Sequence, residues 1–310
     1  MIIIVSEEKD ITTNIVINWL LNKKKTYKVV LSKEINIIND LTINNKELNI
    51  KINNINFNKV NKIWHRRGKF NFSFRTEHQD LNNYLKTDEN VILKAVEKEL
   101  IKLTNYIGSY TKEIENNKLE VLITAKKNNL NIPNTFITSS KKELQNFYST
   151  ASTIITKDLY HPVWFKIKNT QFSSIGTFVV TQQMIDKCND YFIPVFLQEK
   201  VEKKYEVRIF FYKDKLFPMA IFSQNDTKTA VDYRNYNNEK PNRYVPIILT
   251  KELERKIFAL MKDLELNTCS IDFIVNQQNE YVFLEVNPMG QLDWVSKSCN
   301  YYIEKHIAED

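Results

Sequence analysis

Apolar positions at the start of the chain alternate between continuous runs and helical spacing. The run "IIIV" at 2–5 is typical of a buried strand, and apolar residues then recur every three or four positions from about Ile11 to Lys25. The run "YKVVL" at 27–31 predicts a second strand. Strand, helix and strand in this order favour a small α/β unit at the N-terminus.

The pattern continues to a joint near position 108. Segments within 35–52 predict short strands or a hairpin, and "KVNKIW" predicts a strand that ends at Arg66 and Arg67. Helical periodicity across 78–106 would close the first domain, so we expect the joint at Gly108 to Thr111.

Strands become frequent beyond the joint. A single helix is expected across 112–130, followed by a strand that begins in "NIPNTFIT", a helix at 250–264 and a last helix from about Tyr301. Further strands are predicted at 152–158, 164–169, 176–181, 194–201, 205–214 and 215–223.

This layout predicts a mixed fold, α/β followed by two α+β parts. The chain is long enough for two or three packed subdomains. The predicted domains are an N-terminal α/β domain at 1–108, an N-lobe at 109–196 and a C-lobe at 197–310.

The stretch "SIDFIVNQQNEYVFLEVNPMG" at 270–290 predicts a hairpin with acidic residues on one face. Both arms alternate, and symmetric closure of its polar loop would put Asn276 opposite Tyr281 and Asp272 opposite Glu285. Asn287 would share their face because strand side chains repeat with period two. The face expected in the core carries Ile271, Phe273, Val275, Val282, Leu284 and Val286.

Two carboxylates opposite each other repel, so we expect a positive group between Asp272 and Glu285. With Asn287 they offer hard oxygen ligands, which suit Mg²⁺ that takes its remaining ligands from water and substrate phosphates. Zinc fits less well because no His or Cys lies near the motif. The alternative is a cross-strand acidic pair that simply faces solvent.

Composition excludes several classes of protein. The hydrophobic fraction is 43%, without an apolar run long enough to span a bilayer. The start turns acidic too early for a signal peptide, which predicts a cytoplasmic protein without a membrane association. Cys188, Cys269 and Cys299 are widely spaced and are expected to be reduced.

The net charge of +7 lies in the front of the chain. Residues 1–130 hold 22 Lys and Arg against 15 Asp and Glu, whereas 131–310 hold 22 of each. A basic front half suggests an acidic partner, although lysines also simply maintain solubility. The lysines are scattered without interleaved aromatic residues, which argues against nucleic acid and leaves an acidic peptide.

Four cations precede or accompany the hairpin on separate segments. They are Lys118, Lys157, Arg208 in "YEVRIFFY" and Arg234 in "VDYRNY". In this order, and with "LQEKV" at 197–201, they resemble the ATP-grasp superfamily over about 105–310.

That resemblance implies a role for each matching position. Lys118 and Lys157 would contact the nucleotide, and the hinge residues Gln198, Glu199 and Val201 would lend backbone groups to adenine. Glu206 would bind the ribose hydroxyls. Asp272, Glu285 and Asn287 would bind magnesium. The implied fold is an ATP-grasp fold, two α+β subdomains that hold ATP between them, preceded by the small α/β domain.

Further stretches resemble the ATP-grasp peptide maturases, the microviridin-type and grasp-with-spasm ligases. They are "KIWHRRG", "IFSQND", "RYVPIIL", "SIDFIV" and "FLEVNPMGQLDWVS". The resemblance implies a cytoplasmic, ADP-forming ligase that uses ATP and Mg²⁺. Its expected partner is a ribosomally made precursor peptide with a leader and an acidic core, in which it forms intramolecular esters or amides. A homodimer is left open.

One feature departs from the superfamily. Many ATP-grasp proteins cover the triphosphate with a glycine-rich loop, but this chain has only 4 Gly, and the segment after Lys157 contains only Gly176, at its far end. The same scarcity argues against kinase, Walker and Rossmann loops.

The mechanism implied by the resemblance has two steps, activation of a peptide carboxylate as an acyl phosphate and its capture by a hydroxyl or amine. Lys157 would draw charge from the γ-phosphate, and Arg208 and Arg234 would steady the transferred phosphate or the acidic acceptor. Asp232 and His161 are the weak candidates for a general base.

Three functions and two docking sites for the leader remain open at this point. The chain would be the macrocyclising ligase, a ligase that adds free amino acids to a protein or small molecule, or a non-catalytic basic binding protein with a degenerate nucleotide site. The leader would dock on the basic first domain or on a hairpin within 166–180.

Overall fold

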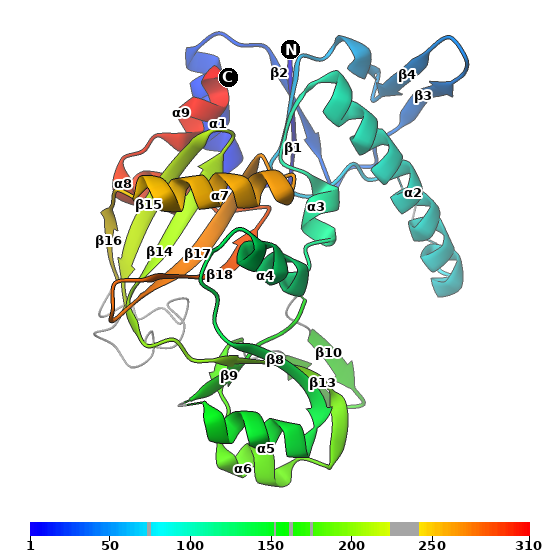
Figure 1. The fold of residues 1–310 in the computed structure, drawn as a ribbon. Coiled ribbons are helices and arrows are strands. Elements are labelled where there is room, and N and C mark those ends of the chain that lie inside the picture. The colour runs from blue at the N-terminus through cyan, green and yellow to red at the C-terminus, as the bar shows by residue number, and fades with distance from the viewer. Residues whose placement is uncertain (73–75, 152, 161–163, 174–175, 224–241) are drawn as a thin grey trace.

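The strands of the computed structural model form three main sheets, each covered by helices, and two short hairpin sheets (Figure 1). Within the described residues, no helix is long and apolar enough to cross a bilayer. The structure describes residues 1–72, 76–151, 153–160, 164–173, 176–223 and 242–310.

The N-terminal sheet has four parallel strands in the order β2-β1-β6-β7. The predicted strand, helix and strand at the start of the chain are confirmed. The helix predicted over 78–106 ends earlier than expected, because 105–107 form a strand that pairs with β6. The bounds are β1 Ile2–Ser6, α1 Ile11–Asn22, β2 Tyr27–Leu31, β6 Lys62–His65, α2 Gln79–Leu103 and β7 Asn105–Ile107.

A three-stranded antiparallel sheet, β3-β4-β5, is inserted between β2 and β6, as the short apolar segments of 35–52 predict. It packs into the core of the N-terminal sheet through Ile50 and Ile52. The bounds are β3 Ile38–Ile43, β4 Leu48–Ile52 and β5 Ile55–Asn56, followed by the 3-10 turn η1 Phe57–Lys59.

The single helix expected across 112–130 is wrong. The chain forms α3, Tyr110–Ile114, and α4, Lys118–Lys127, with a break between them. The side chain of Asn117 caps α4 by accepting hydrogen bonds from the N–H groups of Leu119 and Glu120. The break therefore has a local cause, since an asparagine that bonds the following backbone starts a new helix.

The small sheet has four antiparallel strands in the order β12-β9-β13-β8, with α5 and α6 on its outer side at the bottom of Figure 1. A separate hairpin, β10-β11, follows β9. The bounds are β8 Thr135–Ser140, α5 Lys141–Thr150, β9 Ile154–Thr156, β10 Trp164–Ile167, β11 Thr170–Ser173, β12 Phe178–Val179, α6 Gln182–Lys187 and β13 Tyr191–Glu199.

The large sheet has five antiparallel strands in the order β16-β15-β14-β17-β18. The predicted turn at Lys213 and Asp214 is confirmed, with Lys213 at a φ of 55°. The bounds are β14 Lys203–Tyr212, β15 Lys215–Phe222, β16 Arg243–Pro246, α7 Lys251–Asp263, β17 Thr268–Asn276, β18 Tyr281–Asn287, α8 Asp293–Cys299 and α9 Ile303–Glu309.

The two faces of the large sheet pack against different partners. Val207, Ile209 and Phe211 point to α7 and α4. Phe210 and Tyr212, one position out of phase, point to α8, α9 and the N-terminal sheet. Polar residues on this second face, further along the same strands, therefore lie where the cover of helices ends.

The C-terminal helix joins the large sheet to the N-terminal sheet. Lys62 on β6 is buried and donates to the carbonyl of Ile307 on α9 at 2.6 Å. Burial lowers the pKa of Lys62 to about 8. Arg66, just past β6, is also buried and donates to the carbonyl of Gly290 at 3.1 Å. These contacts fix the position of the N-terminal sheet beside the large sheet.

Gly108 at the joint allows a test of this packing. Its φ is +81°, and a Cβ there would lie 2.2 Å from the carbonyl oxygen of His65, whereas Gly176 has a φ of +76° with open space around it. We expect Gly176→Ala to lower the free energy of unfolding by about 1–2 kcal/mol for the backbone alone. Gly108→Ala should cost roughly 3 kcal/mol or more because the clash adds to that strain. Urea unfolding measures both, and equal losses would contradict the close contact.

Candidate active site

One row of charged side chains crosses the large sheet. Arg208 on β14 pairs in register with Asp272 on β17, and Asp272 pairs with Glu285 on β18. Arg208 shares its face with Phe210 and Tyr212, so strand alternation places the row at the edge of the helical cover. A cation and two carboxylates thus stand side by side on three strands.

The predicted pairing of Asp272 with Glu285 is confirmed, although the predicted loop is not. Val275, and not Asn276, lies opposite Tyr281, and a bulge before Glu285 restores the register. The extra residue is Leu284. It is only half-buried, whereas Phe283 takes the core position expected for it. Bulges of this kind occur beside active sites, where they redirect side chains.

Positive side chains flank the two carboxylates, one in contact with Asp272 and one in contact with Glu285, while the positive group expected between them stays a prediction. Arg208 Nη1 lies 3.1 Å from both oxygens of Asp272, and the guanidinium lies 5.4 Å from the ring of Trp294. Lys157 Nζ, from the segment after β9, lies 3.7 Å from Glu285 Oε2. The alternative of an acidic pair that faces solvent is wrong, because side-chain exposure is only 12% for Asp272 and 18% for Glu285.

The side chain of Asn287 lies next to both carboxylates, so the three polar groups converge on one point. Its Nδ2 lies 3.3 Å from Asp272 Oδ2 and 3.4 Å from Glu285 Oε1. The part of the chain that the structure describes has no group of three or more His, Cys, Asp or Glu side chains suited to a metal. Two carboxylates and one amide are too few for a metal held by protein alone, but they suit Mg²⁺ that keeps waters and phosphate ligands.

The predicted hinge residues lie at the end of β13, in the four-stranded sheet, and in the link that leads to the large sheet. Gln198 is buried and donates to Thr135 Oγ1 at 2.9 Å, and the carboxylate of Glu199 accepts from Asn134 at 2.8 Å. Val201 lies in the three-residue link from β13 to β14 and is half-buried. This link is the place where the two sheets meet along the chain.

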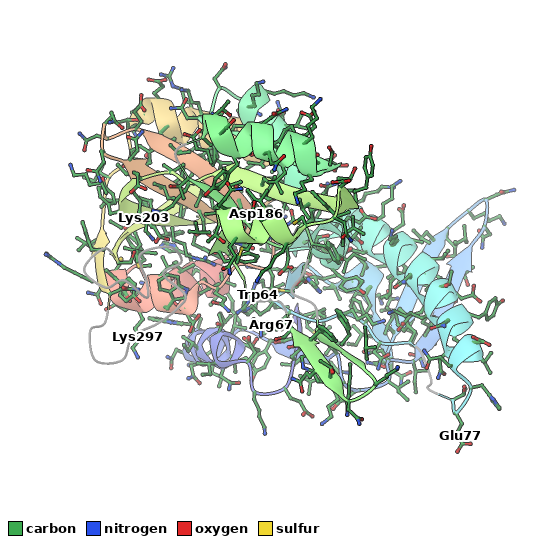
Figure 2. All side chains as sticks on the ribbon, turned by 90° about the horizontal axis from the view of Figure 1, so that it is seen from below. Trp64, Arg67, Glu77, Asp186, Lys203 and Lys297 are labelled. Atoms are coloured by element: carbon green, nitrogen blue, oxygen red, sulfur yellow. The ribbon has the colours of Figure 1, made fainter. Side chains whose placement is uncertain are left out.

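Glu206 lies on the site face of β14, two residues before Arg208. Its carboxylate contacts Lys203 Nζ and accepts from Ser223 at 3.1 Å. Burial raises the pKa of Glu206, and the neighbouring Lys203 opposes that rise. Lys203, labelled in Figure 2, was not singled out from the sequence. The contact could not be predicted from the sequence, because side chains three residues apart on a regular strand point to opposite faces.

Lys118 lies at the start of α4 and reaches the segment that follows Lys157. Its Nζ donates to the carbonyls of Asp158 and of Tyr160, the latter at 3.2 Å. The two predicted nucleotide lysines therefore meet at one short segment. Arg234, Asp232 and His161 fall outside the described residues.

A cavity of about 840 Å³ opens beside the charged row. It reaches from the large sheet to the N-terminal sheet, and Figure 2 shows Arg67 near the middle of the molecule, far from Glu77 and Lys297 at its outer edges. Only a few of its lining residues were singled out from the sequence. The lining residues are Glu7, Arg67, Gly68, Tyr110, Glu113, Ile114, Arg208, Tyr244, Glu285, Asn287, Met289, Gly290, Gln291 and Trp294.

The two arginines after β6 have different surroundings. Arg67 lines the cavity and lies 3.9 Å from Glu7. Arg66 is buried and contacts Asp10 at 3.5 Å and the carbonyl of Met289 at 3.3 Å. Arg66 thus holds the loop after β18, whereas Arg67 is available to a bound molecule.

Comparison with known proteins agrees with this site. Residues 115–310 match the RimK-like ATP-grasp domain, well over half of the chain. The chain belongs to the RimK-like ATP-grasp family. A comparison with curated protein sequences finds no match.

Several solved structures share the fold over nearly the whole chain. The macrocyclase MdnC of Microcystis aeruginosa MRC, solved with its precursor peptide MdnA, has a TM-score of 0.81 at 22% identity, covering 100% of this chain and 98% of its own. A RiPP-associated ATP-grasp ligase of Chryseobacterium gregarium, solved with ADP and a leader and core peptide, has a TM-score of 0.80 at 19% identity, and the match covers 99% of this chain and 95% of that ligase. The ATP-grasp ligase PsnB, solved with minimal precursor, Mg and ADP, has a TM-score of 0.76 at 13% identity, and the match covers 99% of this chain and 96% of PsnB. The predicted ATP-grasp fold is confirmed.

The ion pair of Arg208 and Asp272 gives a prediction for stability. Arg208→Met leaves the Asp272 carboxylate buried without this cation, so we expect the free energy of unfolding to fall by about 3–5 kcal/mol. The double variant with Asp272→Asn should recover part of that loss. Lys251→Met, which breaks an exposed ion pair with Glu254, should change little. A loss in Arg208→Met no larger than in Lys251→Met would contradict the buried pair.

Proposed function

We propose that this chain is an ATP-dependent, ADP-forming ligase that acts on a ribosomally made precursor peptide. It activates an Asp or Glu side chain of the peptide as an acyl phosphate and joins it to a hydroxyl or amine of the same peptide. The observation that carries the proposal is the row of Arg208, Asp272 and Glu285, of which Arg208 and Glu285 line a cavity large enough for peptide side chains.

The donor set fits ATP with Mg²⁺. Asp272, Glu285 and Asn287 would hold the metal, and Lys157 and Lys118 would face the phosphates. When bound, Mg²⁺ would neutralise charge on the triphosphate. Arg208 already binds a carboxylate with one nitrogen shared between both oxygens, so its guanidinium suits phosphate as well.

The adenosine end would lie at the link between the two sheets. Gln198, Glu199 and Val201 would offer backbone groups to adenine, and Glu206 would accept from the ribose hydroxyls. Arg234, outside the described residues, is proposed with Arg208 to steady the transferred phosphate. The domain limits at 108 and 196 remain proposals, and the second falls inside β13.

A peptide partner is supported by an apolar hairpin. On β10, the exposed fractions of the large apolar side chains Trp164, Phe165 and Ile167 are 65%, 46% and 55%, and Phe172 on β11 is 42% exposed. Exposed apolar patches of this kind mark binding sites for other chains. The hairpin, at 164–173, overlaps the segment around 166–180 that is predicted as a leader dock. Similar solved ligases contain precursor peptides, which supports the same partner here.

A second candidate is a ligase that adds free amino acids to a protein or small molecule, which the same site would serve. Mass spectrometry of a precursor incubated with enzyme and ATP separates the two. Loss of water without added mass supports ring closure within the peptide. Stepwise gain of amino-acid mass would support the second candidate and overturn the first.

Glu285→Gln tests the metal assignment. The variant removes a charged ligand, so we expect ADP release to fall to background while the precursor still binds, as measured by a coupled ADP assay and by fluorescence anisotropy. Glu280→Gln is the matched control, because Glu280 lies in the exposed turn of the same hairpin. Full turnover by Glu285→Gln would show that Glu285 is not a metal ligand.

The exposed hairpin gives a prediction for binding. Trp164→Ser removes apolar area that a leader would bury, so the Kd for the precursor should rise about tenfold or more. Ile248→Ser is the control, since Ile248 is 95% exposed on the large-sheet side of the molecule. Calorimetric titration measures both. Equal affinities of the Trp164 variant and the wild type would exclude this hairpin as the dock.

A further inference from the structure

The cavity beside the charged row has a second wall with its own chemistry. Arg208 and Glu285 bound it on the large sheet, whereas Tyr110, Glu113 and Arg67 bound it on the side of the joint and the N-terminal sheet. A carboxylate activated next to Glu285 would share this space with the group that attacks it. The second wall therefore faces the acceptor.

The carboxylates and phenols of the described lining residues differ in their ability to take a proton. Glu285 is paired with Lys157, and Glu7 is half-exposed and lies 3.9 Å from Arg67. Burial raises the pKa of Tyr110, so this phenol keeps its proton at neutral pH. Tyr244 is a phenol as well, and a phenol is a poorer proton acceptor than a carboxylate. Among these groups, Glu113 remains.

The fold holds Glu113 at a fixed place relative to the charged row. Ser109 caps α3, and the N–H of Glu113 donates to the Ser109 carbonyl at 3.2 Å. Just past α3, Asn116 Nδ2 donates to the carbonyl of Val286 at 3.1 Å. Val286 lies between Glu285 and Asn287 on β18, so the segment that carries Glu113 is fastened to the strand that carries the metal ligands.

The charges around Glu113 are mixed. Burial raises its pKa, and Glu7 adds to the rise, while Arg67 and Arg66 oppose it. Among the described lining residues, Tyr110 on the same helix and Arg208, Glu285 and Tyr244 on other elements are further titratable groups of this cavity. A carboxylate whose pKa is raised is a stronger base in its ionised form.

Resting on the proposed function, we propose that Glu113 accepts the proton of the peptide hydroxyl or neutral amine that attacks the acyl phosphate. The acceptor oxygen or nitrogen forms a bond to the acyl carbon, and the bond from that carbon to the phosphate oxygen breaks. Inorganic phosphate leaves with the electron pair, and the proton passes to a Glu113 carboxylate oxygen and then to water. Glu113 is absent from the activation step.

The test separates the two steps with hydroxylamine. Hydroxylamine is a strong nucleophile that captures acyl phosphates as hydroxamates without a protein base. The probe is a synthetic precursor peptide with a leader and an acidic core, incubated with ATP, Mg²⁺ and enzyme, and both products are followed by mass spectrometry. In Glu113→Gln we expect ring closure to fall about 100-fold or more, while the hydroxamate forms as in the wild type.

Two further variants control for structural effects. Glu115→Gln changes the next glutamate along the segment, which is exposed and lies 2.6 Å from Lys94, and should leave both products unchanged. Glu113→Asp keeps a carboxylate and should restore part of the closure rate. In the wild type, closure should rise with pH as Glu113 ionises, above the usual range of a glutamate, and Glu113→Gln should lack this rise.

The outcomes are distinct. Ring closure at the wild-type rate in Glu113→Gln overturns the inference. Loss of the hydroxamate together with the ring in that variant also overturns it, because Glu113 would then act in activation or folding. A wild-type enzyme that forms neither product overturns the proposed function itself and the inference with it.

Discussion

The ion pair of Arg208 with Asp272 is the interaction on which the site depends. It lies between adjacent strands of the large sheet, in a place where burial makes an isolated carboxylate costly. With Lys157 it balances the charges of the two facing acids of β17 and β18. The repulsion of two carboxylates is thereby converted into a prearranged binding site. The register of β14, β17 and β18 places Arg208, Asp272 and Glu285 side by side, and the segment after β9 supplies Lys157.

Much of the site could be predicted from the sequence because strand alternation is a strong constraint. The hairpin pattern alone placed Asp272 opposite Glu285. That result survived an error in the assumed loop, since the shift at Tyr281 and the bulge at Leu284 cancel. The bulge itself could not be predicted, because Phe283 and Leu284 are both apolar and either fits the core. The order of cations along the chain supplied the family, and the structure brings Lys118 and Lys157 together.

Other features depend on contacts that a sequence pattern does not encode. The helix expected over 112–130 is broken because the side chain of Asn117 accepts hydrogen bonds from the backbone at the start of α4, although apolar residues occur on both sides of the break. Glu113 lies in the charged run "KEIE" and looks like a surface residue; it lines the cavity only because the N-terminal sheet is beside it. The short strand β7 owes its conformation to β6 rather than to its own three residues. Each case reflects tertiary packing that overrides local preference.

The buried guanidinium of Arg66 has a consequence for movement in the catalytic cycle. It comes from the N-terminal sheet, yet it grips two carbonyls of the loop that immediately follows Asn287. Moving the N-terminal sheet away from this loop would break both hydrogen bonds and leave Asp10 as the ionic partner of Arg66. The contact therefore couples the position of the first domain to the loop that follows the proposed metal ligands.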